Sequence, residues 1–213
     1  TYSNVYFREP ESRADQTRMM SIVTTGAETG YYVDVFRSRK EKGGDKMHDY
    51  FYHNLGQTLT LTAADGSDLN LQPTEELAFA GAHLYAYSYL YDKKVAATNK
   101  DVKATFTIDM KDKDGDDIYM NLWMKGEPDR EIFTALAPMT EGLSRTPNMP
   151  YNIKEQPTLT FVARQHGEAW NRPFVSIYEP STKKEPSAIQ SVSYFDAEGA
   201  GLEDFAGICV KSK

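Results

Sequence analysis

Apolar and polar residues alternate in short segments along most of the chain, and this period of two indicates half-buried β-strands. The segments lie at residues 19–25, 31–36, 47–53, 57–62, 83–91, 104–110, 118–124, 131–138, 158–165, 174–178, 189–195 and 208–210. Only Thr74–Leu77, where a threonine precedes two acids, suggests the start of a short helix. The pattern predicts an all-β fold: an antiparallel β-sandwich of about eleven or twelve strands with almost no helix. We expect it to form a single domain over residues 1–213.

Two pairs of these segments have the pattern of hairpins. In the first, the strands of 31–53 are joined by the charged segment 38–46, which contains Gly43 and Gly44. In the second, 104–110 and 118–124 flank Asp114-Gly115, a strong hairpin signal. The loop 111–117 is rich in aspartate, so calcium binding is the alternative to a plain turn, but no known calcium-loop spacing is present. Residues 139–157 contain three prolines and predict a long surface loop.

Charge and cysteine content narrow the classes of partner. The chain of 213 residues has 24 Lys and Arg against 31 Asp and Glu, which gives a net charge of −7. This acidity argues against nucleic acid and anionic membranes, because both attract basic surfaces. Cys209 is the only cysteine, so no disulfide forms within the chain, and no apolar run is long enough to cross a membrane. The chain begins at Thr1 without a signal peptide, so we expect a processed chain or an excised piece.

The main chemical candidates lie between His48 and His53. On a strand, His48 and Tyr50 share one face, while Asp49 and His53 share the other. A metal site here would need a third ligand from elsewhere in the chain, such as His83 or His166. We therefore favour an ordinary His–Asp hydrogen bond within a sheet and predict no metal and no cofactor.

Aromatic residues are candidates for binding sugars, because an aromatic face packs well against a pyranose ring. The segment 83–91 places tyrosines at alternate positions, and as a strand it would form a tyrosine ladder that includes Tyr87. Cross-strand packing is the alternative for this ladder. Trp170 lies beside a turn and Trp123 within a strand, and core packing is the alternative for both tryptophans.

Arg37, Arg39, Lys40 and Lys42 form the one visible basic cluster, and a solvated turn is the alternative to a patch that binds anions. The candidates for glycan binding are Arg37, His48, Tyr50, His53, Tyr87 and Trp170. The sequence contains no Gly-x-Ser-x-Gly elbow, no phosphate-binding or dinucleotide glycine loop, no His-Glu-x-x-His and no paired cysteines. No catalytic residue is assigned.

Two stretches carry a family resemblance. Residues 31–53, YYVDVFRSRKEKGGDKMHDYFYH, and residues 172–180, RPFVSIYEP, followed by IQSV at 189–192, occur in this order. They resemble the β-sandwich region that follows a helical toroid in heparinase II/III-like polysaccharide lyases. The resemblance implies that this chain packs against a helical toroid domain of a lyase and that the substrate is an acidic polysaccharide. It also implies a bacterial protein that is periplasmic, secreted or on the cell surface.

Lyases of that family abstract the proton next to a uronic-acid carboxylate and then eliminate the glycosidic bond, which needs a base, an acid and a group that neutralises the carboxylate. Most of these residues lie on the toroid, and the family's His-x-His-x-Asp-type motif is absent here. The resemblance therefore implies a supporting domain that helps to form a glycan cleft without catalytic residues. The alternatives are an independent carbohydrate-binding or cell-surface module, and a small enzyme acting through His48, Asp49, His53 and a tyrosine.

Overall fold

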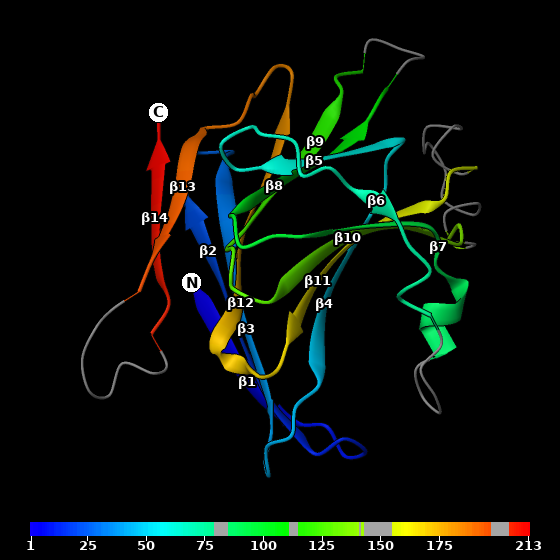
Figure 1. Ribbon diagram of the computed structural model, residues 1–213. Coiled ribbons are helices and arrows are strands. Elements are labelled where there is room, and N and C mark those ends of the chain that lie inside the picture. The colour runs from blue at the N-terminus through cyan, green and yellow to red at the C-terminus, as the bar shows by residue number, and fades with distance from the viewer. Residues whose placement is uncertain (79–84, 111–114, 141, 143–154, 197–204) are drawn as a thin grey trace.

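The computed structural model describes residues 1–78, 85–110, 115–140, 142, 155–196 and 205–213 (Figure 1). These residues form fourteen strands and one 3₁₀-helix, η1 (Tyr85–Tyr89). The strands are β1 (Tyr2–Arg8), β2 (Ala14–Thr24), β3 (Gly30–Lys40), β4 (Met47–Asn54), β5 (Thr58–Ala63), β6 (Gln72–Pro73), β7 (Tyr91–Ala97), β8 (Val102–Ile108), β9 (Ile118–Met124), β10 (Arg130–Ala137), β11 (Thr158–His166), β12 (Ala169–Thr182), β13 (Ile189–Phe195) and β14 (Gly207–Ser212).

The strands form three antiparallel sheets, which confirms the predicted all-β class. A seven-stranded sheet has the order β1-β2-β3-β12-β9-β8-β5, and a five-stranded sheet has the order β4-β11-β10-β7-β6. The third sheet is the β13–β14 hairpin, which lies on the outer side of the seven-stranded sheet (Figure 1). Within the described residues, no helix is long and apolar enough to span a membrane.

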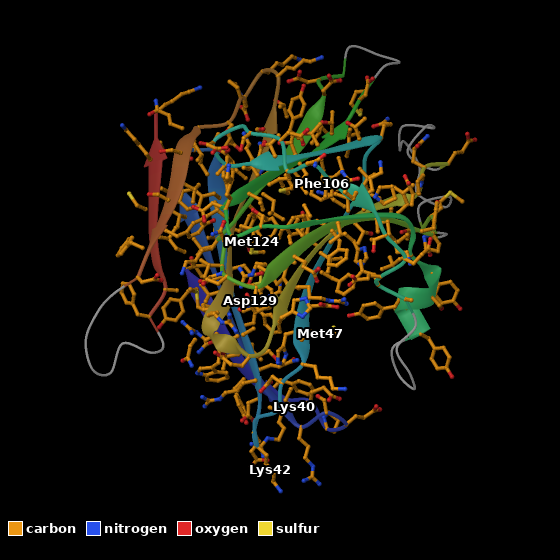
Figure 2. All side chains as sticks on the ribbon, in the orientation of Figure 1. Lys40, Lys42, Met47, Phe106, Met124 and Asp129 are labelled. Carbon is orange, nitrogen blue, oxygen red and sulfur yellow. The ribbon has the colours of Figure 1, made fainter. Side chains whose placement is uncertain are left out.

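The main core lies between the two large sheets. Phe106, Leu122 and Phe174 of the seven-stranded sheet are fully buried together with Phe161 and Ile132 of the five-stranded sheet. Figure 2 shows the side chain of Phe106 among the sticks that fill this space. Burial of such large apolar side chains is the main favourable contribution to folding a sandwich.

A second and a third apolar cluster lie on the outer faces of the sheets. Trp123 and Ile177 of the seven-stranded sheet pack against Ile189 and Val192 of β13, so core packing is the role of Trp123. On the five-stranded sheet, Phe133, Ala135 and Val162 are covered by Leu77 and Leu90. Both large sheets are therefore buried on each face over part of their area.

The predicted hairpin of 31–53 is wrong in its pairing, although both of its strands exist. β3 pairs with β2 and β12, whereas β4 pairs with β11 in the other sheet. Alternation specifies which side chains face the core but not which strand lies alongside. The turn after β3 therefore carries the chain from one sheet to the other, and both strands turn their buried faces toward the same core.

The second predicted hairpin is confirmed, because β8 and β9 pair from Ile108 opposite Ile118 to Val102 opposite Met124. The last predicted strand is also present, as β14 paired with β13. The predicted loop 139–157 and the acidic loop 111–117 lie largely outside the described residues. The sequence did not predict β1, β6 or β7, and it missed the first part of β2.

The segment 83–91 is not a strand, and this prediction is wrong. Residues 85–89 form a 3₁₀-helix, while residues 83 and 84 are outside the described part of the chain. With three residues per turn, alternate tyrosines do not share a face. Tyr87 is half-buried, whereas Tyr85 and Tyr89 are 64% and 63% exposed.

The helix predicted to start at Thr74 is also wrong. Residues 74–78 are irregular, and the Thr74 hydroxyl accepts a hydrogen bond from the Glu76 amide in a local turn. The threonine thus satisfies a backbone donor without a helix, which is a common alternative for this residue type.

The inner face of β1 and β2 is exposed, because these strands lie at one end of the longer sheet. Val5, Phe7, Met20, Ile22 and Tyr32 share the face that carries Asp34 in the adjoining strand, and each is between 38% and 58% exposed. We call these five residues the β1–β2 apolar face. They share this face with the polar residues Ser3, Gln16 and Arg18. Exposed apolar side chains gathered on one face mark a site of interaction in many proteins.

Replacing Phe106 by alanine is expected to lower the free energy of unfolding by about 3–5 kcal/mol, because it leaves a cavity between the two sheets. Ile118→Ala is the control, since Ile118 is 40% exposed at the end of the neighbouring strand. Chemical denaturation measures both variants. Equal losses for the two would contradict the placement of the core.

Candidate functional site

The six glycan-binding candidates fall in four places. His48 and Tyr87 line one cleft, Arg37 and Trp170 line a separate groove, Tyr50 is buried between the sheets, and His53 lines neither cavity. The cleft lies beside β4, and we call it the β4 cleft. The groove lies on the outer face of β1, β2 and β3, and we call it the Trp170 groove.

The β4 cleft has a volume of about 520 Å³. Its polar lining residues are Glu9, Ser12, Gln16, Ser38, His48, Asp49, Glu76, Tyr87 and Arg164. Three carboxylates thus stand against one guanidinium and one imidazole. This balance makes the cleft a poor site for a polyanion.

Asp49 is the central polar residue of the β4 cleft. Its carboxylate accepts two hydrogen bonds from the Arg164 guanidinium, both 2.8 Å long, and one of 2.6 Å from the Tyr87 hydroxyl. The side chains of Asp49 and Arg164 are only 7% and 8% exposed. Burial and the Asp49 charge raise the pKa of Tyr87 well above its ordinary value, so Tyr87 is a phenol donor at neutral pH.

The histidines do not form a cluster with Asp49. His48 Nε2 lies 2.7 Å from Asp45 Oδ1, and Asp45 also accepts a hydrogen bond from the Lys40 amide. His53 Nδ1 lies 2.9 Å from the Thr160 hydroxyl. The expected His–Asp hydrogen bond therefore exists, but its carboxylate is Asp45 in the turn, three residues before His48.

His166, named as a possible third metal ligand, instead bonds Glu131 at 2.6 Å. His83 is outside the described residues. In the part of the chain that the structure describes, no three His, Cys, Asp or Glu side chains gather as ligands.

Tyr50 belongs to a buried polar network. Its hydroxyl donates to Asp34 Oδ2 at 2.6 Å and contacts the hydroxyl of Tyr178. Arg18 donates to the same carboxylate, with its Nε 3.0 Å from Asp34 Oδ1. Burial and the nearby Asp34 charge raise the pKa of Tyr50 well above its ordinary value. Tyr50 is 3% exposed, and its position indicates a structural role.

The Trp170 groove brings together two candidates that lie far apart in the sequence. It has a volume of about 450 Å³ and is lined by Asn4, Thr17, Met19, Val35, Arg37, Trp170, Phe205, Ala206 and Ile208. The Arg37 guanidinium donates to the main-chain carbonyl of Trp170 and, at 3.2 Å, to that of Phe205. None of the described residues that line the groove is acidic.

Arg39 completes this site from outside the groove. Its guanidinium lies 4.0 Å from the centroid of the Trp170 ring, which is a close cation–π contact. Strand alternation places Arg37 and Arg39 on one face of β3, the face that carries the groove.

The predicted basic cluster is therefore divided, and the solvated-turn interpretation of Arg37 is wrong. Arg37 lies within β3 and is 5% exposed, because the strand continues to Lys40. Lys42 lies in the turn beyond β3, at the lower tip of the molecule in Figure 2. Of the four basic residues in this predicted cluster, Arg37 and Arg39 contact Trp170.

No protein-family model matches the chain. The chain is 33% identical over 196 residues to an endo-acting ulvan lyase of Formosa agariphila. The match covers 90% of this chain and 22% of the relative, so the chain spans about a fifth of the length of the protein that it resembles. This similarity supports a relationship to polysaccharide lyases, while the more specific heparinase II/III-like assignment is not confirmed.

Asp49→Asn is expected to lower the free energy of unfolding by about 3 kcal/mol, because it leaves the buried Arg164 guanidinium with only the half-exposed Glu76, 3.3 Å away, as an acidic partner. The matched control is Asp129→Asn, which removes the partner of Arg172 at a side chain that is 71% exposed. The fall in the free energy of unfolding of Asp129→Asn should stay below about 1 kcal/mol. Denaturant titration compares the two variants, and equal effects would show that the Asp49–Arg164 pair is not buried.

Treatment with a chelator is expected to leave the melting temperature unchanged, because no three His, Cys, Asp or Glu side chains gather as ligands among the described residues. Differential scanning fluorimetry with and without chelator measures this. A fall of several degrees that added metal restores would reveal a structural metal site.

Proposed function

We propose that this chain is a non-catalytic β-sandwich module of a polysaccharide lyase, and that its 213 residues act as one domain. In this role it supports the catalytic part of the lyase and helps to form the glycan cleft. The observation that carries the proposal is the 33% identity to an ulvan lyase over 90% of this chain, combined with the small share of that lyase which is matched.

The geometry of the β4 cleft favours a supporting role over catalysis. β-Elimination next to a uronic-acid carboxylate needs a base, an acid and a group that neutralises the carboxylate. Here the Arg164 guanidinium is paired with Asp49, and the Tyr87 hydroxyl donates to the same carboxylate. His48 is bonded to Asp45. These groups hold one another in place, and the surplus of carboxylates opposes an anionic substrate.

The proposal extends to the partner of the module. We propose that a helical domain of the same lyase, such as the toroid of heparinase II/III-like enzymes, packs against the β1–β2 apolar face. This face exposes five apolar or aromatic side chains on one side of a sheet, and its burial would stabilise an interface. We further propose a periplasmic, secreted or cell-surface setting, where the polysaccharide is available.

An independent carbohydrate-binding module is the second candidate function. The Trp170 groove favours it, because an aromatic ring beside two guanidinium groups suits a sugar whether or not a catalytic domain is attached. The two candidates differ in whether the chain is needed for lyase activity.

The purified chain is expected to produce no unsaturated uronic-acid product from ulvan or other uronic-acid polysaccharides, as followed by ultraviolet absorbance. Grafted in place of the matching segment of the Formosa agariphila lyase, it is expected to support cleavage of ulvan. Product formation by the chain alone, abolished by His48→Gln or Tyr87→Phe, would contradict the supporting role.

The same graft tests the partner face. In the grafted lyase, Phe7→Ser and Ile22→Ser are expected to reduce activity or expression. Tyr85→Ser is the control, because the Tyr85 side chain lies on η1 and is 64% exposed, and it should leave both unchanged. If the graft of the unsubstituted chain folds but has no activity, the independent module is favoured instead.

A further inference from the structure

We propose that β1 is an interface for a second copy of this chain, in which two β1 strands pair antiparallel and join two seven-stranded sheets into one. This inference goes beyond the proposed function, because it concerns contacts between copies rather than the role of the module in a lyase. β1 is the terminal strand of its sheet, and no described strand lies beyond it (Figure 1). All seven of its residues are exposed.

The backbone groups of β1 that point away from β2 have no partner among the described residues. A backbone hydrogen bond joins Thr1 to Ile22 at one end of the β1–β2 ladder, and another joins Glu9 to Ala14 at the other end. Bonded and non-bonded pairs alternate along an antiparallel ladder, so the odd-numbered residues of β1 bond to β2. The outward-pointing amides and carbonyls belong to Tyr2, Asn4, Tyr6 and Arg8.

β1 also lacks the features by which edge strands avoid pairing with other chains. Protected edge strands are short, or they contain proline, lysine or a bulge. β6, at the end of the five-stranded sheet, has two residues and includes Pro73. By contrast, β1 has seven residues without proline or lysine, and its register with β2 is continuous from Tyr2 to Arg8. An edge of this kind is open to a further strand.

The sequence of β1 is complementary to itself when two copies run antiparallel. One register pairs all four residues whose backbone groups point outward: Tyr2 with Arg8 of the second copy, and Asn4 with Tyr6 of the second copy. The arginine then lies beside an aromatic ring, and no two like charges are opposite each other. A shift of two residues in either direction leaves Arg8 or Tyr2 without a partner in β1. Backbone pairing and charge therefore favour the same symmetric register.

This register also extends the β1–β2 apolar face across the junction. The two-fold axis passes between Val5 and Val5 of the second copy, and Phe7 lies opposite Ser3 of the second copy. Contact between the two valines removes apolar area from water and adds to the backbone hydrogen bonds. Because the pairing uses the edge of the sheet, a lyase domain can still cover its face.

Sedimentation velocity of the purified chain over a series of concentrations tests the assembly, and we expect a reversible monomer–dimer equilibrium. Asn4→Pro should weaken dimerisation at least about tenfold, because it deletes a hydrogen bond on each side of the two-fold axis. The Asn4 amide makes no bond to β2, so this variant should keep its fold, as verified by circular dichroism. Asn4→Ala is the matched control, since it changes the same side chain, keeps the amide and should leave dimerisation unchanged.

Disulfide cross-linking tests the register, and it remains informative if Asn4→Pro does not fold. The starting chain carries Cys209→Ser, because Cys209 is exposed and free. Val5→Cys should form a disulfide-linked dimer on oxidation, since opposite residues of a non-hydrogen-bonded pair have Cα atoms about 4.5 Å apart. Ser3→Cys is the control on the same face, because the two Ser3 residues would lie about 13 Å apart along the strands.

A chain that stays monomeric at all concentrations would overturn the proposal, as would equal cross-linking of Val5→Cys and Ser3→Cys. A dimer that is unaffected by Asn4→Pro but lost in Phe7→Ser and Ile22→Ser would also overturn it, because the copies would then meet through the β1–β2 apolar face. None of these outcomes decides whether the grafted lyase is active, so the proposed function is tested separately.

Discussion

The buried carboxylate of Asp34 is the constraint on which the sandwich depends. Asp34 is fully buried in the seven-stranded sheet, and it receives hydrogen bonds from Arg18 of the same sheet and Tyr50 of the other. A buried charge without such partners would cost several kcal/mol, so the two sheets must meet in the register that supplies them. The crossover from β3 to β4 must therefore place Asp34 of β3 and Tyr50 of β4 within hydrogen-bond distance of each other.

A second buried carboxylate organises the outer face in the same way. Glu179 of β12 is 4% exposed and accepts hydrogen bonds from the amides of Ala188 and Ile189, 2.8 and 3.2 Å long. It therefore fixes the start of β13 on the outer side of the seven-stranded sheet. The β13–β14 hairpin then brings Ile208 to the wall of the Trp170 groove. The hydrogen bonds of the Glu179 carboxylate thus help to position one wall of the Trp170 groove.

The sequence predicted individual strands well because alternation is a local property. The bounds of β9 and β13 agree with the predicted segments 118–124 and 189–195. Strand partners were less predictable, since the pairing of β3 with β12 and of β4 with β11 depends on residues more than 100 positions away. The tyrosine segment failed because alternation alone does not determine the backbone: residues 85–89 form a 3₁₀-helix, in which alternate side chains do not share a face. The contact of Arg37 with Trp170 had no local signal, although both residues were candidates for separate reasons.

The period of two along β1 and β2 also explains how one small module could serve two partners. Met19 lines the Trp170 groove, and the next residue, Met20, lies on the β1–β2 apolar face on the opposite side of the sheet. Asn4 and Val5 are divided between the same two surfaces. A protein domain that covers the apolar face leaves the groove open to solvent. A glycan contact at the groove and the proposed lyase interface are therefore sterically compatible, because β1 and β2 contribute side chains to both surfaces from opposite sides of the sheet.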